Sequence, residues 1–140
     1  MPSFTTYKPT SITQFEAAKL NFNAQGVSGS ASAGSSTSFD LALTDDHLIT
    51  GAWIITDGGT LGDTASFQIV DGTGAFSGVP GTVLNQFVSS WYMPTGANTQ
   101  LDMQYPAKLY AGMVLRFVYT STGGSPVFVA INYKLHKVLI

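Results

Sequence analysis

The chain contains no cysteine. Its absence excludes disulfide-stapled scaffolds, zinc fingers, thiol catalysis and iron–sulfur clusters held by cysteine. Long apolar runs are missing as well, because the longest one covers only residues 127–131, whereas a membrane-spanning helix needs about 20 residues. The opening residues, MPSFTTYKPT, lack the apolar centre of a secretory signal peptide. We therefore expect no membrane partner and no export signal.

Charge is scarce. Asp, Glu, Lys and Arg make up 10% of the residues, against about 25% in an average soluble domain, and the mean hydropathy is +0.19. Six basic residues against eight acidic ones argue against a nucleic-acid partner. Surfaces this poor in charge tend to associate, although a surface rich in Ser and Thr hydroxyls would also fit the composition. We expect a homo-oligomer or a component of a larger assembly.

Residues 1–25 are predicted to form an N-terminal arm. Pro2 and Pro9 favour an extended chain. Ser11 and Gln14 have the spacing of a capping box before FEAAKL, which is compatible with one short helix in the arm.

The next segment, residues 26–38, has the sequence GVSGSASAGSSTS and consists almost wholly of Ser, Gly and Ala. Such a segment is either a flexible linker or a strand whose small side chains permit close approach of another backbone. We favour the strand, because a linker would leave the arm without a partner of its own.

From residue 39 to residue 140 apolar residues recur with a period of two, which indicates β-strands. Turn signals such as Asp-Gly, Pro-Gly and Gly-Gly separate the runs. The predicted strands cover residues 39–43, 47–56, 64–70, 83–92, 101–105, 113–119 and 127–133. Seven or eight such strands predict an all-β domain, an antiparallel β-sandwich with jelly-roll topology. Because some strands are apolar on both faces, we expect a neighbouring subunit to cover one sheet.

No residue pattern indicates catalysis. The chain has two imidazoles, His47 and His136, and one glutamate, Glu16, in the arm. It has neither a Gly-x-Ser-x-Gly elbow nor a glycine-rich loop leading to a lysine. The sequence alone does not exclude a Ser-His-Asp triad, because such a triad is defined by its geometry and not by a sequence motif. His136 lies in a Leu- and Val-rich segment, where a packed or interfacial role fits better than that of a base. We predict that the protein is not an enzyme.

A metal site has more support in the sequence than a catalytic site. Asp57 and Asp63 flank the glycine-rich turn DGGTLGD, and Asp45, Asp46 and Asp71 could converge on it. Calcium takes six to eight oxygen ligands from such loops, but the spacing does not match an EF-hand, and Asp-Gly is also an ordinary hairpin turn. We expect structural turns and no cofactor, with Asp57 and Asp63 as the candidate ligands if Ca²⁺ is bound.

Aromatic residues make up 12% of the chain. Sugar-binding modules stack sugars on exposed aromatic rings, whereas both tryptophans here lie within alternating apolar runs, which favours core packing. The residues predicted to pack in the core are Trp53, Phe67, Trp91, Leu115 and Ile131.

Three stretches resemble a known group of proteins. They are GDTASFQIVD (residues 62–71), GTVLNQFVSSWYMP (81–94) and YPAKLYAGMVLRFVYTSTGGSPVFVAINYKLHK (105–137). Within residues 40–140 the chain resembles the small jelly-roll virion proteins of tailed bacteriophages, which are head-decoration (cement) proteins or fibre subunits. The resemblance lies in aromatic-ended strands and an Ala-Gly pair before a long β run, and it transfers no binding residue.

The resemblance implies a structural virion protein that forms a trimer, with other virion proteins such as the capsid protein as partners. The N-terminal arm would dock on the shell while the sandwich faces outward. The alternative is a receptor- or glycan-binding β-sandwich module at a phage tail or a cell surface. That alternative requires a Tyr or Trp exposed at one end of the sandwich.

Overall fold

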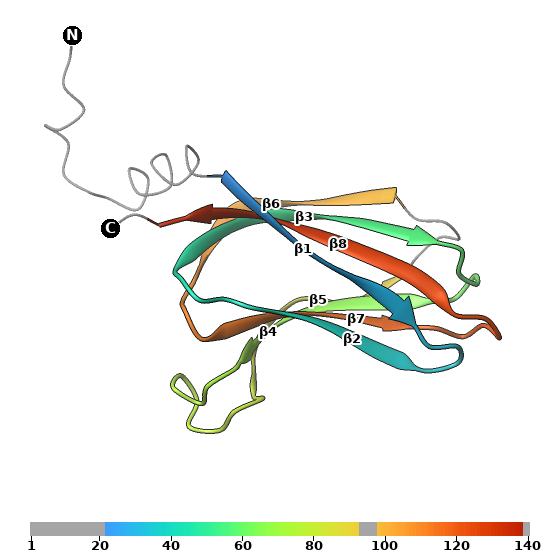
Figure 1. Ribbon diagram of the computed structural model, residues 1–140, viewed down its shortest axis with the longest axis horizontal. Helices are drawn as coiled ribbons and strands as arrows, with labels where there is room; N and C mark the ends of the chain where they lie inside the picture. Colours follow the sequence, from blue (N-terminus) through green and yellow to red (C-terminus); the bar gives the residue numbers. More distant parts are fainter. Residues whose placement is uncertain (1–21, 93–97, 139–140) are drawn as a thin grey trace, which may run out of the picture.

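The computed structural model describes residues 22–92 and 98–138, which form an all-β sandwich of eight strands (Figure 1). The strands are β1 (Phe22–Ala31), β2 (Ser36–Ala42), β3 (His47–Asp57), β4 (Thr64–Asp71), β5 (Val83–Tyr92), β6 (Asn98–Leu109), β7 (Met113–Thr120) and β8 (Val127–Lys137). The seven strands predicted from residue 39 onward are all present, and β1 contains the first half of the Ser/Gly/Ala-rich segment, for which a strand was the favoured alternative. Among the described residues no helix is long and apolar enough to cross a membrane.

The strands form two four-stranded sheets, in the orders β1-β8-β3-β6 and β2-β7-β4-β5, and all neighbours are antiparallel. The chain changes sheet at every connection except the one between β4 and β5. Two four-stranded antiparallel sheets interleaved in this way constitute a jelly roll, so the predicted fold class is confirmed.

The Ser/Gly/Ala-rich segment belongs to the sandwich. Its first half completes β1, and its end begins β2. A Cβ at Gly26 would collide with the Asn132 side chain, and one at Gly29 would lie 3.0 Å from the Phe39 ring, so the small residues permit close packing as the strand alternative required. The linker alternative is wrong, and the sandwich begins at Phe22 rather than at residue 39. The predicted short helix lies outside the described residues, as does the arm up to residue 21.

The core lies between the two sheets. Phe67, Leu115 and Ile131 are buried in it as predicted. The Phe67 ring packs edge-on against Tyr133, with ring centroids 5.2 Å apart, and so joins the two sheets. The side chain of Trp91 lies outside the described part of the structure.

Trp53 is not a core residue. Its side chain is 39% exposed, and the reason is a β-bulge in β3. Between Ile49 and Gly51 the register shifts, with two residues of β3 advancing against one of β8. An extra residue reverses the inside–outside phase of a strand. Ile49, Ala52 and Ile54 are therefore buried, while Trp53 faces solvent.

Candidate functional site

The outer face of the β1-β8-β3-β6 sheet carries the most varied group of accessible side chains. Its apolar half consists of Trp53 and Ile55 from β3 and of Phe128 and Ala130 from β8. Trp53 and Phe128 are 39% and 48% exposed, and Ile55 and Ala130 pair across the strands between them and are half-buried. The adjacent positions of β1 are occupied by small residues, Gly26, Ser28 and Ser30. This half of the face therefore presents aromatic side chains next to a row of small side chains on β1.

The Trp53 ring is held in place by a hydrogen bond across the sheet. Its Nε1 donates to Asn98 Oδ1 at 2.6 Å. Gln100 on β6 and Asn132 on β8 are its register partners on the two sides. An indole fixed at its polar edge and flanked by amide side chains presents a preorganised amphipathic surface.

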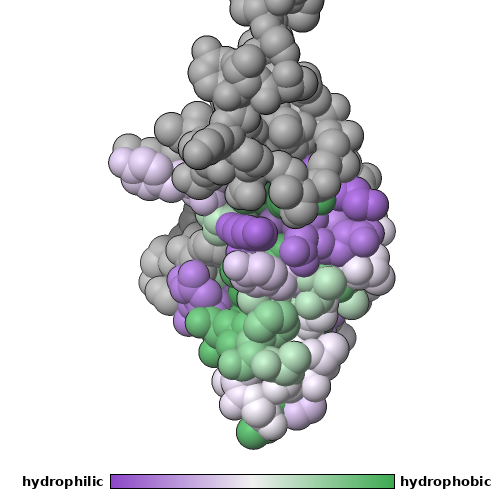
Figure 2. All heavy atoms as spheres, turned by 90° about the vertical axis from the view of Figure 1, so that its left-hand side faces the viewer, coloured by the Kyte–Doolittle hydropathy of each residue, from purple (hydrophilic) through white to green (hydrophobic). Residues whose placement is uncertain are grey.

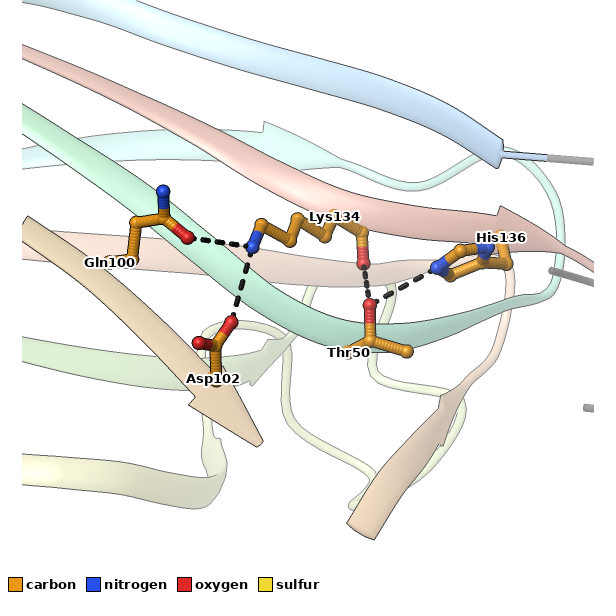
Figure 3. Close-up of polar contacts among 5 residues, drawn as sticks. All are labelled: Thr50, Gln100, Asp102, Lys134 and His136. Carbon is orange, nitrogen blue, oxygen red and sulfur yellow. Dashed lines mark hydrogen bonds and ion pairs between the residues drawn. The ribbon is translucent and has the colours of Figure 1, made fainter. Parts of the chain in front are cut away.

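The polar half of the face is a network around Lys134 (Figure 3). Lys134 Nζ donates to Gln100 Oε1 and to Asp102 Oδ1, each at 3.1 Å. Thr50 Oγ1 donates to the Lys134 carbonyl oxygen at 3.3 Å and lies 3.1 Å from His136 Nε2. The charges of Lys134 and Asp102 neutralise each other, so this network is polar without a net charge.

Thr50 and His136 together have the form of a nucleophile and a base. The Thr50 hydroxyl lies within hydrogen-bond distance of both the Lys134 carbonyl oxygen and His136 Nε2, and its one hydrogen can serve only one of them. When that hydrogen bonds the carbonyl oxygen, Nε2 of His136 is the donor in the bond to Thr50. His136 is buried, in agreement with the packed role expected for it. An imidazole that donates to the hydroxyl in this way is not placed to remove its proton.

Asp63, the first of the candidate calcium ligands, is fully buried and acts as an internal acceptor. Its Oδ2 accepts hydrogen bonds from Tyr119 Oη at 2.7 Å and from the Thr60 amide at 3.0 Å. Its Oδ1 accepts from the amide and the hydroxyl of Thr122, both at 2.8 Å. Four donors from the chain bond to the carboxylate, so Asp63 joins the turn after β3 to the end of β7.

The electrostatics of Asp63 follow from these donors. Burial by itself would raise the pKa of Asp63, but the hydrogen bonds from Tyr119, Thr122 and Thr60 outweigh it and lower the pKa to about 2. Burial and the hydrogen bond to Asp63 raise the pKa of Tyr119 well above its ordinary value. At neutral pH the pair is thus an ionised carboxylate and a neutral phenol.

Asp57, the second candidate, is exposed at the end of β3, opposite Phe128. Within residues 22–92 and 98–138, no three His, Cys, Asp or Glu side chains gather as a metal-binding group. The structure therefore does not assemble the convergent set of carboxylates that the aspartate positions suggested.

Asp71 organises the loop between β4 and β5. Its Oδ2 accepts hydrogen bonds from the Phe76 amide and from the amide and hydroxyl of Ser77, and its Oδ1 accepts one from the Gly74 amide. Desolvation would raise the pKa of Asp71, but these bonds lower it overall. The buried carboxylate thus fixes the shape of a loop that projects from one end of the sandwich (Figure 1).

No family model and no curated protein matches the chain. Among solved structures, a fucolectin from striped bass (Morone saxatilis) serum has a TM-score of 0.42 and 11% identity, covering 86% of this chain and 48% of that one. A structure of infectious bursal disease virus, Gt strain, matches with a TM-score of 0.31 and 9% identity, and the match covers 84% of this chain and 42% of that one. The VP2 subviral particle of that virus has a TM-score of 0.26 and 13% identity, covering 83% and 40%. The chain spans less than half the length of each.

The loop fixed by Asp71 carries a second accessible apolar area, which we call the end patch. It comprises Phe76 and Val79 of the loop, and Tyr110 from the turn between β6 and β7. Val79 is 63% exposed, and the rings of Phe76 and Tyr110 lie 6.1 Å apart. Figure 2, which views the end of the sandwich where this loop projects, shows hydrophobic surface gathered there.

The two aspartate clusters predict acid sensitivity. A carboxylate whose pKa is lowered on folding stabilises the fold above its unfolded pKa, and that contribution is lost as the pH falls through the folded value. For Asp63 the window runs from about 4 down to about 2, and Asp71 acts in the same direction. Thermal melts at pH 7, 4, 3 and 2 should show the melting temperature falling most steeply below pH 4.

The variant Asp63→Asn is the matched control for this dependence. It removes the titrating group while keeping its volume, so its melting temperature should vary less with pH between 4 and 2 than that of the wild type. A wild-type protein equally stable at pH 5 and pH 2 would contradict the assignment of both aspartates.

Proposed function

We propose that this chain is a structural virion protein of a tailed bacteriophage, a capsid decoration (cement) or fibre-type subunit that self-associates and docks on other virion proteins such as the capsid protein. The role proposed is non-catalytic, without a cofactor. The observation that carries the proposal is a complete jelly roll with few charges whose outer sheet face exposes Trp53 and Phe128.

Composition and surface point in the same direction. Fourteen charged residues in 140 leave little repulsion between copies, and two of those charges, on Lys134 and Asp102, cancel on the outer sheet face. Exposed aromatic side chains within such a surface are typical of interaction sites. The resemblance of residues 40–140 to small phage virion proteins supports the same assignment, and it also implies the trimer.

The virion assignment predicts where the protein is found. Mass spectrometry of phage particles purified through a density gradient should detect this chain in a copy number that is constant between preparations. A chain present in the lysate but absent from purified particles would contradict a structural role in the virion.

Attachment is expected to depend on the residues before β1. A variant lacking residues 1–21 should keep the circular dichroism spectrum of the full chain but fail to bind particles from which the protein has been removed. The deletion must stop at residue 21, because Phe22 begins β1. Normal binding of this variant would transfer the docking role from the arm to the sandwich.

One observation favours the alternative of a glycan-binding module. Trp53 is exposed, its Nε1 is held by Asn98, and Gln100 and Asn132 flank it. Sugars bind such groups by stacking on the ring and by hydrogen bonding to amide side chains. Trp53 itself lies on a sheet face, and the exposed aromatic residue that the alternative requires at an end of the sandwich is Tyr110 of the end patch. A saturable change in tryptophan fluorescence on titration with sugars, abolished in Trp53→Ala, would favour the alternative.

A further inference from the structure

We propose that the free edge of β1 pairs with β1 of a second copy of this chain, antiparallel and across a two-fold axis. This inference rests on the self-association in the proposed function and names the surface that performs it. The two β1-β8-β3-β6 sheets would then become one continuous eight-stranded sheet.

The geometry of β1 suits strand addition. All ten of its residues pair with β8, from Phe22 opposite His136 to Ala31 opposite Val127, without a register shift. Within the described part of the chain no strand pairs with its other side. A regular edge of ten residues is about 33 Å long, and its outward N–H and C=O groups form a template for another strand.

Two of the other three edges are irregular. The pairing of β5 with β4 shifts register three times. In β6 the register against β3 jumps from Ala107 to Asp102 while β3 advances only from Ile49 to Gly51, and the residues between include Pro106. Bulges and proline are devices that prevent edge-to-edge pairing.

The fourth edge, β2, differs from β1 in length and charge. It has seven residues and carries Asp40, which forms an ion pair with Arg116 at 2.9 Å. Strand β1 has neither charge nor proline over its whole length. It is therefore the one edge among the described strands that is long, regular and uncharged.

The composition of β1 also indicates what pairs with it. In a two-fold antiparallel pair each strand meets its own sequence, so a charged residue near the axis would face its like. The sequence FNAQGVSGSA contains none, and the exposed positions Gly26, Ser28 and Ser30 have side chains too small to obstruct the approach. An uncharged edge with small side chains fits a second copy of itself.

The test places one charge at the centre of this edge. Ser28→Lys changes an exposed residue of β1, and Ser38→Lys is the matched control on the edge strand β2, where Ser38 is also exposed. Light scattering coupled to size exclusion should give the wild type and Ser38→Lys twice the 14.8 kDa of one chain, or an even multiple of it. Ser28→Lys should elute at 14.8 kDa with an unchanged circular dichroism spectrum.

The outcomes separate this inference from the proposed function. A wild-type trimer that Ser28→Lys leaves intact would overturn the β1 edge while the self-associating virion subunit stands. A wild-type monomer would overturn both. If Ser28→Lys does not fold, hydrogen exchange of the wild type decides: the β1 amides should lose protection on dilution while the β2 amides keep it. Equal protection of β1 at all concentrations would overturn the pairing.

Discussion

Replacing Asp63 by alanine is expected to lower the free energy of unfolding by about 4 kcal/mol. The substitution leaves the Tyr119 hydroxyl, the Thr60 amide and both donors of Thr122 without their acceptor inside the protein. A buried donor that loses its partner costs about 1–3 kcal/mol. Urea denaturation at pH 7, monitored by tryptophan fluorescence, would measure the change.

The matched control is Asp57→Ala, at the start of the same turn. Asp57 is exposed, so its removal should change stability by less than about 0.5 kcal/mol. Both variants are measured with calcium and with EDTA. A wild-type protein stabilised by calcium, together with equal losses in the two variants, would show that the aspartates act as metal ligands and would contradict the internal role of Asp63.

Truncating Phe67 to alanine is the second large effect, with an expected loss of about 3–5 kcal/mol. Phe67 is 2% exposed and contacts the ring of Tyr133 in the opposite sheet, so its removal opens a cavity between the sheets that the β-strands cannot collapse to fill. Thermal and urea unfolding of the purified variant would measure the loss.

Trp53→Ala is the comparison that tests the bulge in β3. Trp53 is partly exposed and makes one hydrogen bond across the sheet, so its truncation should cost about 1 kcal/mol. If Trp53→Ala destabilised the protein as much as Phe67→Ala, Trp53 would be a core residue and the phase reversal between Ile49 and Gly51 would be wrong.

The strands were predictable because apolar and polar residues alternate along a strand that has one face buried and the other exposed. Leu115, Phe117 and Tyr119 alternate with residues of intermediate exposure along β7, and Ile131 and Tyr133 do the same on β8. The all-β class and the core positions of Phe67, Leu115 and Ile131 follow from that local signal.

For Trp53 the alternation of apolar and polar residues predicted the wrong face of the strand. The extra residue in β3 has no distinctive side chain, and the bulge is defined by pairing with β8, whose residues lie about 80 positions later in the chain. Gly51 is the local trace of the irregularity: a Cβ there would collide with the Leu101 carbonyl oxygen of β6. A glycine within a strand is a signal of a bulge or of close backbone approach.

The role of Asp63 depended on contacts that the sequence does not display. Its partners Tyr119 and Thr122 lie 56 and 59 residues away, so an aspartate in a glycine-rich turn looks the same whether it binds calcium or a phenol. Only the bonds to Thr60, three residues earlier, are local: the Thr60 amide donates to the Asp63 carboxylate, and the Asp63 amide closes the turn by donating to the Thr60 carbonyl oxygen.

The outer sheet face was predictable only in part. Asn132 and Lys134, which are of intermediate exposure, alternate with buried Ile131, Tyr133 and Leu135, and this alternation marks the outer face of β8. That Asp102 and Gln100 of β6 would meet Lys134 depends on the strand order β8-β3-β6, in which the lysine reaches across β3. The order of strands in a sheet depends on contacts between distant parts of the chain, so it cannot be predicted from the alternation of residues within one strand.

Light scattering coupled to size exclusion on the full chain tests the central claim, that this jelly roll is a self-associating structural subunit. We expect a mass of at least two chains of 14.8 kDa, unchanged when calcium is replaced by EDTA, since the Asp63 carboxylate accepts four hydrogen bonds from its own chain. A two-fold assembly would agree with pairing through β1, and a trimer with the resemblance to phage virion proteins. A monomer of 14.8 kDa in both buffers would show that the chain does not self-associate and would make the glycan-binding module the better assignment.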